Sequence, residues 1–200
     1  MPEDYQTFED RAGSSESYKK LTLLKIPIDL KHKAFLDLGC NEGYFCFIAE
    51  ALGADVTGVE NNQHWHSRAN DRKSLMFSSV NFVLQDWNAY LDSTHRQFDV
   101  ILFSATFHYL KENQQEFLTK IIRHLRKDGL FILEAGIAPG ITPEIKSIRR
   151  DGDGGTFQYP TWPMLYRMVA YAGFRSIQVI GDGLNQKGDH IPRFVIHCKI

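Results

Sequence analysis

The segment FLDLGCNEGYF, from Phe35 to Phe45, constrains the fold of this chain more than any other feature. A short apolar run contains an acidic residue, two glycines follow four positions apart, and an amphipathic run begins. This order predicts a buried strand, a sharp turn and the start of a helix. Because Gly39 and Gly43 lack a β-carbon, the turn can take positive φ and a ligand can approach the backbone closely.

The same segment predicts where a ligand binds. The helix that follows the turn offers free amide donors and positive potential at its N-terminus. Asp37 puts a carboxylate at the carboxyl end of the strand, and open α/β sheets bind their ligands at that edge. We therefore expect a site for a nucleotide-like molecule.

Composition limits the remaining choices. A chain of 200 residues predicts a single domain, residues 1–200. The net charge of −1 gives no general argument for nucleic acid or an acidic membrane as partner. No apolar run approaches the roughly 18 residues of a membrane span, and the acidic first residues are unlike a signal peptide. The three cysteines, Cys40, Cys46 and Cys198, are typical of reduced thiols in a cytoplasmic protein.

Strands and helices alternate along most of the chain, which predicts a doubly wound α/β fold with a mostly parallel sheet. The expected strands are Ala34–Leu38, Asp55–Glu60, Val80–Leu84, Phe98–Phe103 and Leu130–Ala135. The expected helices are Ser17–Leu24, Tyr44–Leu52, Asn62–Lys73, Asn113–Lys127 and Trp162–Ala172. Two further strands, Phe174–Ile180 and Ile191–Lys199, follow without a helix between them, so they must pair antiparallel or not pair directly.

Two segments fall outside this alternation. Residues 1–30 form a polar arm with the aromatic residues Tyr5, Phe8 and Tyr18 and with Arg11. This arm either folds over the ligand site as a lid or packs on the surface without order. Residues 136–160 are rich in glycine and proline and predict a long loop, which is usually functional or disordered. Its cations Lys146, Arg149 and Arg150 either hold an anionic substrate or form a solvated face.

Two common nucleotide motifs are poorly supported. The dinucleotide fingerprint needs a glycine where Asn41 stands, and the P-loop needs a lysine followed by serine or threonine where Gly43-Tyr44 stands. Asn41 tolerates left-handed backbone better than most residues, so a tight turn is still expected there.

Taken together, these motifs resemble the class I S-adenosylmethionine-dependent methyltransferases over nearly the full length of the chain. The resemblance is carried by Asp37, Gly39 and Gly43, by Glu60, by Asp86, by FDVILFSATFHYL (98–110) and by the closing strand pair. It implies a three-layer, seven-stranded, Rossmann-like sheet with an antiparallel final strand, and S-adenosyl-L-methionine as cofactor.

The resemblance also implies roles for single residues. Glu60 matches the acid that binds the ribose, Asp86 matches the acid near the adenine, and Trp87 or the Asp86 backbone frames the ring. Asp37 supports the loop or the amino group of the cofactor. The residues expected to contact the cofactor are Asp37, Gly39, Cys40, Asn41, Gly43, Glu60, Asn61, Asp86, Trp87 and Ser104.

Candidate acceptor-side residues follow the fourth strand. His108 is the best candidate for a general base, with packing against the cofactor as the alternative. Tyr109 contacts the acceptor or fills the wall of the site. Glu134 orients a substrate, binds a cation or accepts a hydrogen bond from a loop. His64 and His66 do not share a helix face, so a metal site is not expected.

The acceptor is expected to be a small or sugar-like molecule, methylated at oxygen. Nucleic acid is possible but less favoured, because no basic surface is evident in the sequence. The alternatives are a modifier of tRNA or other RNA, a subunit or sensor that binds the cofactor without catalysis, and a nicotinamide-binding protein.

Overall fold

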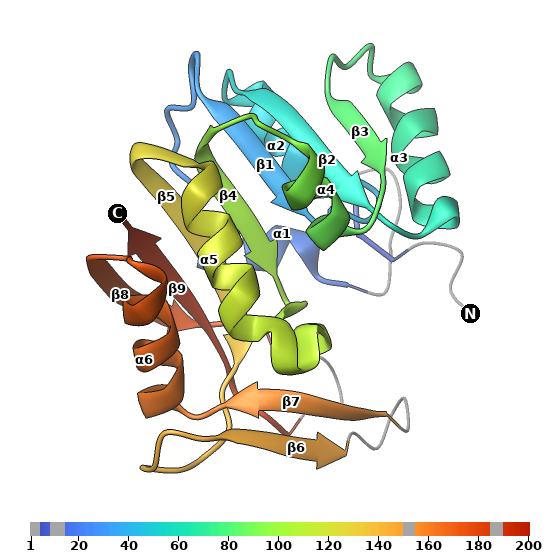
Figure 1. The fold of residues 1–200 in the computed structure, drawn as a ribbon. Coiled ribbons are helices and arrows are strands. Elements are labelled where there is room, and N and C mark those ends of the chain that lie inside the picture. The colour runs from blue at the N-terminus through green and yellow to red at the C-terminus, as the bar shows by residue number, and fades with distance from the viewer. Residues whose placement is uncertain (1–4, 9–14, 150–154, 185–189) are drawn as a thin grey trace.

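The computed structural model describes residues 5–8, 15–149, 155–184 and 190–200. Within them, a seven-stranded sheet has the order β3-β2-β1-β4-β5-β9-β8 (Figure 1). Its strands are β1 (Ala34–Leu38), β2 (Asp55–Glu60), β3 (Asn81–Leu84), β4 (Phe98–Ser104), β5 (Leu125–Gly136), β8 (Ser176–Asp182) and β9 (Arg193–Lys199). β1 to β5 run parallel, and β9 lies antiparallel between β5 and β8. The predicted fold class and the antiparallel pairing of the last two strands are both confirmed.

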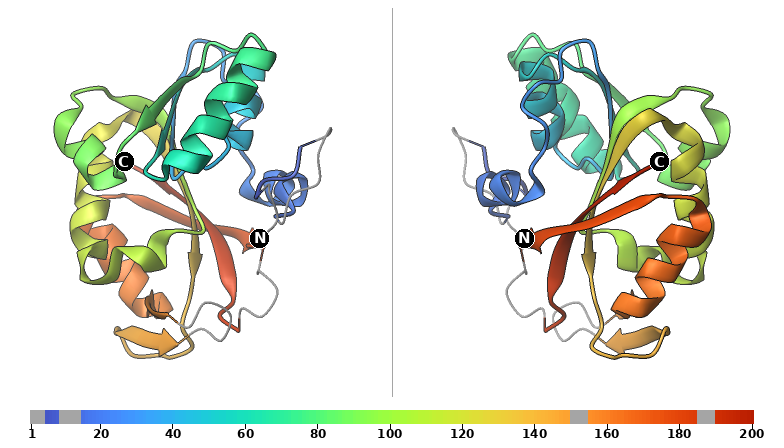
Figure 2. Two further views of the ribbon diagram at one scale, coloured as in Figure 1. Left: turned by 90° about the vertical axis from the view of Figure 1, so that its right-hand side faces the viewer. Right: turned by 90° about the vertical axis from the view of Figure 1, so that its left-hand side faces the viewer.

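Helices cover the two faces of the sheet. They are α1 (Ser17–Leu24), α2 (Tyr44–Ala51), α3 (Gln63–Leu75), α4 (Trp87–Ser93), α5 (Gln114–His124) and α6 (Trp162–Ala172), with the 3-10 helix η1 (Phe107–Asn113). α1 to α3 lie on one face and α4 to α6 on the other (Figure 2). No helix in the described part of the chain is long and apolar enough to cross a membrane.

The two apolar cores explain why the central strands are continuous apolar runs. In β1, Phe35 packs into the core under α1 and α2, whereas Leu36 packs into the core under α4 to α6. Both side chains are fully buried. A strand covered on both faces has no solvent side, so it shows no alternation of polar residues.

The order of strands reverses between β1 and β4. β2 and β3 extend the sheet from β1 in one direction, and β5, β9 and β8 extend it from β4 in the other. In an open α/β sheet, a crevice at the carboxyl ends of the strands opens at such a point and is the usual ligand site. The topology therefore places the glycine turn after β1 beside the segment after β4.

Two predicted elements need correction, and one helix was not predicted. The helix expected to reach Lys127 ends at His124, because Leu125 is extended and pairs with Phe98 in the sheet. α4 was not predicted, and the Asp86 side chain caps it. The expected loop 136–160 contains the antiparallel hairpin of β6 (Ile145–Arg149) and β7 (Thr156–Pro160), which packs against η1.

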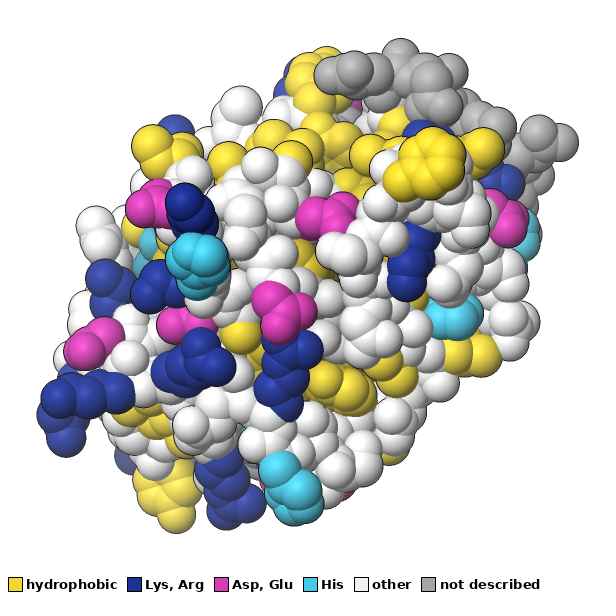
Figure 3. Space-filling model, turned by 90° about the horizontal axis from the view of Figure 1, so that it is seen from above, with side chains coloured by type: hydrophobic (Ala, Val, Ile, Leu, Met, Phe, Trp, Pro, Cys, Tyr) yellow, Lys and Arg dark blue, Asp and Glu magenta, His cyan; other side chains and the backbone are white. Residues whose placement is uncertain are grey.

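Charged side chains join elements at the opposite, amino end of the strands. Asp99 accepts hydrogen bonds from the backbone amide of Ala34 (2.8 Å) and from Arg126 (2.7 Å), and Lys33 lies 3.6 Å away. Seen from this end, basic and acidic side chains are interspersed (Figure 3). These pairs tie β1, β4 and β5 together far from the predicted ligand site.

Gly58 in β2 provides a direct test of packing beneath the glycine turn. A β-carbon there would lie 2.8 Å from the sulfur of Cys46, 2.9 Å from that of Cys40 and 2.9 Å from the Phe82 ring. We expect Gly58→Ala to lower the free energy of unfolding by about 1–3 kcal/mol, because overpacking forces the neighbours to move.

Urea unfolding measures the effect, and Gly181→Ala in β8 is the matched control. No atom lies within 4 Å of a β-carbon at Gly181, so the change there should be within about 0.5 kcal/mol. Equal effects at the two glycines would contradict this account of the packing.

Candidate functional site

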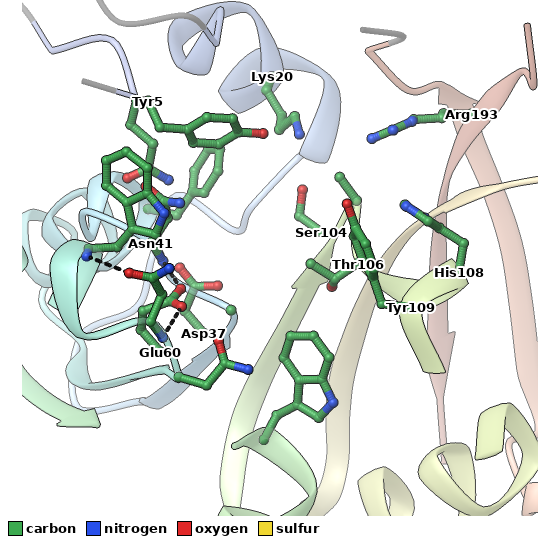
Figure 4. Close-up of a pocket in the computed structure, with 18 residues that line it drawn as sticks. Tyr5, Lys20, Asp37, Asn41, Glu60, Ser104, Thr106, His108, Tyr109 and Arg193 are labelled. Carbon is green, nitrogen blue, oxygen red and sulfur yellow. Dashed lines mark hydrogen bonds between the residues drawn. The ribbon is translucent and has the colours of Figure 1, made fainter. Parts of the chain in front are cut away.

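A cavity of about 670 Å³ opens at the carboxyl ends of β1, β2 and β4 (Figure 4). Its size lies in the range of small-molecule sites. The lining residues come from the arm, α1, the strand ends and β9: Tyr5, Gln6, Lys20, Asp37, Gly39, Asn41, Phe45, Glu60, Asn61, Asn62, Trp65, Trp87, Ser104, Ala105, Thr106, His108, Tyr109 and Arg193. Most of the predicted site residues are therefore brought together.

The turn after β1 has the left-handed backbone that its sequence predicts. Asn41 has φ 55° and Gly43 has φ 85°. A β-carbon at Gly43 would lie 2.6 Å from the Phe82 ring, so glycine is required there by both conformation and space. Gly43 does not line the cavity, and it shapes the turn from behind.

Glu60 ties this turn to the loop after β2. One carboxylate oxygen accepts from the amide of Asn41 (2.9 Å), and the other accepts from the amide of Asn62 (2.8 Å) (Figure 4). Glu60 is 7% exposed and lines the cavity. A carboxylate has about four lone-pair sites, so each oxygen can still accept one hydroxyl from a ligand.

Two predicted contacts lie elsewhere. The Oδ1 atom of Asp86 accepts from the amides of Asn88 and Ala89 at the start of α4, and Asp86 does not line the cavity. Its neighbour Trp87 does line it. Cys40 is buried behind the turn, with its sulfur against Gly58. The family resemblance named Asp86 for the adenine, and its position after a strand is also that of a helix cap.

The arm reaches the cavity through a buried carboxylate. Glu42, 3% exposed, accepts from the amides of Tyr5 (2.9 Å) and Gln6 (2.7 Å), and its other oxygen accepts from Arg68 (2.7 Å). The Gln6 side chain accepts from the amide of Tyr44 (2.9 Å). Tyr5 and Gln6 thus line the cavity, whereas Arg11 lies outside the described residues. Whether this segment closes as a lid stays a prediction.

Glu134 organises the segment after β4. This fully buried carboxylate accepts from Ser104 Oγ (2.5 Å) and from the amide of Leu184 (3.1 Å), and Lys20 Nζ lies 3.0 Å away. The hydrogen bond from the loop amide is one of its predicted roles, and Lys20 is a partner from within the chain. Ala105, which follows Ser104 at the end of β4, has a φ of 63°. This is a strained backbone conformation for alanine, and it lies at the cavity wall.

His108 is held in a cage of aromatic rings. Its ring stacks on Tyr159 at 5.3 Å and 15°, and meets the edge of Phe157 at 5.2 Å and 84°. His108 is 2% exposed and directs its ring toward the cavity (Figure 4). Tyr109, 48% exposed, lies beside it at the cavity mouth. β7 supplies the cage, so the segment predicted as a loop fixes the candidate base.

Several lining residues were missed by sequence reasoning. Lys20 and Arg193 are distant in sequence and carry no motif, so only the folded structure brings them to the cavity. Trp65 and Asn62 also line it. The available signal for Asn62, which caps α3, was an asparagine at the first position of the predicted helix. In the described residues, no three histidine, cysteine or acidic side chains gather in a possible metal site.

The predicted cationic cluster lies away from the cavity. Lys146 lies 3.4 Å from Glu144, and Arg149 is exposed at the end of β6. Arg150 lies outside the described residues. Neither described cation lines the cavity.

Asp37 is the most strongly perturbed carboxyl in the cavity. Burial raises its pKa to about 7, and the nearby Glu60 carboxylate contributes in the same direction. The Cys46 thiol, which donates a hydrogen bond of 3.5 Å, and the Lys20 cation oppose this rise. The ionised form is therefore costly without a ligand and becomes favourable when a cation binds next to it.

This raised pKa predicts a pH-dependent stability. Between about pH 4 and pH 7 the unfolded chain ionises Asp37 while the folded protein keeps its proton, so the free energy of unfolding falls as pH rises. Above the folded pKa, this contribution becomes constant. Asp37→Asn should remove it.

Thermal unfolding of both proteins from pH 4.5 to pH 8 measures the contribution. We expect the stability of the wild type relative to Asp37→Asn to decrease over that range. Parallel curves would contradict the raised pKa.

The carboxylates and the aromatic ring of the cavity fit a nucleoside with a cationic tail. Glu60 offers acceptors for vicinal hydroxyls, Asp37 offers a carboxylate for an ammonium group, and Trp87 offers an aromatic face. A β-carbon at Gly39 would lie 3.5 Å from Trp87 and Thr106 and would narrow the cradle. S-adenosylmethionine presents the matching groups: vicinal ribose hydroxyls, an ammonium group and an adenine ring.

Comparisons with known proteins agree with this chemistry. The model of the methyltransferase domain family matches residues 29–149. A tRNA U34 carboxymethyltransferase from Nautilia profundicola is 25% identical over 168 residues, which span 82% of this chain and 55% of that protein. An uncharacterized methyltransferase from Schizosaccharomyces pombe is 28% identical over 94 residues, 47% of this chain and 64% of that protein. The chain thus spans about half to two thirds of these curated relatives.

Solved structures share the fold at low identity. An S-adenosylmethionine-dependent methyltransferase structure from Listeria monocytogenes has TM-score 0.69 and 17% identity, covering 92% of this chain and 100% of that one. The N-terminal domain of EvdMO1 with S-adenosylhomocysteine bound has TM-score 0.71 and 15% identity, covering 98% and 90%. The chain belongs to the methyltransferase domain family, as a class I member whose cofactor is S-adenosylmethionine.

Proposed function

We propose that this protein transfers the methyl group of S-adenosylmethionine to an oxygen atom of a small or sugar-like acceptor. The observation that carries the proposal is the buried His108 ring, which faces the cavity from an aromatic cage. A hydroxyl acceptor needs a base, and imidazole is the common one near neutral pH.

The proposed placement of the cofactor follows the polar groups. Glu60 binds the ribose hydroxyls with the lone pairs that Asn41 and Asn62 leave free. Asp37 faces the ammonium group, and Trp87 frames the adenine. Bound in this way, the cofactor supplies an electrophilic methyl group on a sulfonium sulfur. The wall formed by Ser104, Ala105 and Thr106 then lies next to the acceptor.

The residues of the chain would perform three tasks in the reaction. The cavity aligns the acceptor oxygen with the methyl carbon and sulfur, which is the main source of rate in such displacements. His108 takes the hydroxyl proton as the oxygen–carbon bond forms and the carbon–sulfur bond breaks. Tyr5 and Gln6 of the arm limit access of water to the site.

A tRNA acceptor is the second candidate. It is favoured by the similarity to the tRNA U34 carboxymethyltransferase, which extends over 82% of this chain. The chain covers 55% of that relative, and its net charge is −1. A basic surface is the usual electrostatic feature of an RNA-binding protein, so we rank this candidate second.

We also propose a cytoplasmic site of action, which the three free cysteines favour.

Transfer of a labelled methyl group distinguishes these candidates. The protein is incubated with methyl-labelled S-adenosylmethionine and, in separate reactions, a small-metabolite extract and total tRNA. Label in a small molecule supports the proposal, and label in tRNA alone supports the second candidate. Binding of S-adenosylhomocysteine without any transfer would favour a non-catalytic subunit or sensor.

The ribose role predicts a loss of cofactor affinity in Glu60→Ala. Each hydrogen bond to a charged group is worth ~1.5–3 kcal/mol, so losing one weakens the affinity for S-adenosylhomocysteine by at least about ten-fold. Calorimetric titration measures it, with Glu116→Ala on exposed α5 as control. A folded Glu60→Ala protein that binds within two-fold of the wild type would exclude Glu60 from this role.

The base role predicts a separation of binding from turnover in His108→Phe. Phenylalanine keeps an aromatic ring in the cage, so S-adenosylhomocysteine should bind within about two-fold of the wild type. The rate of methyl transfer should fall about 10²- to 10⁴-fold. Tyr171→Phe, at an exposed position of α6 outside the cavity, is the control. Unchanged turnover in His108→Phe would leave His108 a packing residue.

A further inference from the structure

Two cationic side chains from distant parts of the sequence meet in the cavity. Lys20 comes from α1, with its side chain 13% exposed, and Arg193 begins β9, with 3% exposure. Both line the cavity, and Figure 4 shows their charged ends directed toward the same space beside Ser104. The proposed function assigns the ribose to Glu60 and the adenine to Trp87, so neither Lys20 nor Arg193 is needed to bind these two groups.

Arg193 belongs to the acceptor side of the cavity. It pairs with Gly136 of β5, and a β-carbon at Gly136 would lie 2.7 Å from the Tyr159 ring. Tyr159 in turn stacks on His108. The backbone of Arg193 is thus connected through Gly136 and Tyr159 to His108, and Arg193 and His108 both line the cavity, whereas Asp37 and Glu60 lie at the ends of β1 and β2.

The charges of this corner favour an anion. Glu134 is the carboxylate next to Lys20, at 3.0 Å, and Ser104 and Leu184 also donate to it. An ammonium group has three donors and a guanidinium has five in a planar fork, and neither group can accept a hydrogen bond, so a ligand group that meets these two charged ends must itself accept hydrogen bonds. Glu134 balances the charge of Lys20, and a carboxylate or phosphate is the ligand group that a guanidinium in the cavity wall pairs with best.

We infer that the acceptor is a small molecule with a carboxylate or phosphate group, and that Arg193 binds this group with help from Lys20. The inference rests on the proposed transfer to a small molecule. A guanidinium pairs with both anions in a planar, two-bond geometry, which fixes orientation as well as position. Anchored there, the acceptor presents a hydroxyl to His108 in the same cavity. Arg193 is then a specificity-determining residue.

The cofactor has a carboxylate of its own, so the experiment must show whether Arg193 binds that carboxylate or the anionic group of the acceptor. If Arg193 held the cofactor, its substitution would weaken binding of S-adenosylhomocysteine. If it holds the acceptor, that affinity stays within two-fold and the KM for the acceptor rises. Arg167→Gln, on an exposed position of α6, is the matched control.

The experiment begins with the wild-type protein and methyl-labelled S-adenosylmethionine. A small-metabolite extract is separated by anion exchange into an anionic pool and a neutral or cationic pool, and each is tested as acceptor. We expect label in the anionic pool. Label in the other pool alone would overturn the inference but leave the proposed function standing. Label in neither pool would contradict the proposed function, and the inference with it.

Substitutions of Arg193 then test whether this residue binds the acceptor. With the labelled acceptor, Arg193→Gln should raise KM at least ten-fold, and Arg193→Lys, which keeps the charge, should raise it less. An unchanged KM in folded Arg193→Gln would overturn the assignment of Arg193, as would loss of affinity for S-adenosylhomocysteine. Because the pool experiment uses the wild type, it decides the charge of the acceptor even if a variant fails to fold.

Discussion

The site depends on the Glu60 carboxylate, which joins two loops that no strand pairing connects. By accepting from the amides of Asn41 and Asn62, it fixes the turn after β1 relative to the loop after β2. Both amides would otherwise lack a strand partner at the point where the sheet ends. The same carboxylate faces the cavity, so one side chain sets the shape of the cradle and offers acceptors to the ligand.

Other buried carboxylates repeat this arrangement around the cavity. Glu42 holds the arm against the turn, and Glu134 holds Lys20 and Ser104 beside the segment after β4. A buried carboxylate is stable only when hydrogen bonds or cations satisfy it, so each of these groups requires a defined geometry of its neighbours. Asp37 has fewer such partners, and burial raises its pKa to about 7.

Local patterns predicted most of the fold and one half of the site. Apolar runs predicted β1, β2 and β4, and the resemblance to a known family then singled out residues at their carboxyl ends, including Glu60. Tertiary pairing decided what the sequence could not: Leu125 joins the sheet and ends α5 early, and β6 with β7 forms a hairpin in the glycine-rich segment. Lys20 and Arg193 reach the cavity only through the packing of α1 and the insertion of β9, and neither has a local signal.

A structure of the protein with S-adenosylhomocysteine bound tests the central claim most directly, namely that Glu60 anchors the ribose and that the wall of His108 and Arg193 faces the reacting group. The account predicts both ribose hydroxyls within hydrogen-bond distance of the Glu60 carboxylate, and the sulfur directed toward Ser104 and His108. A ribose bound away from Glu60, or a sulfur that points away from this wall, would contradict it.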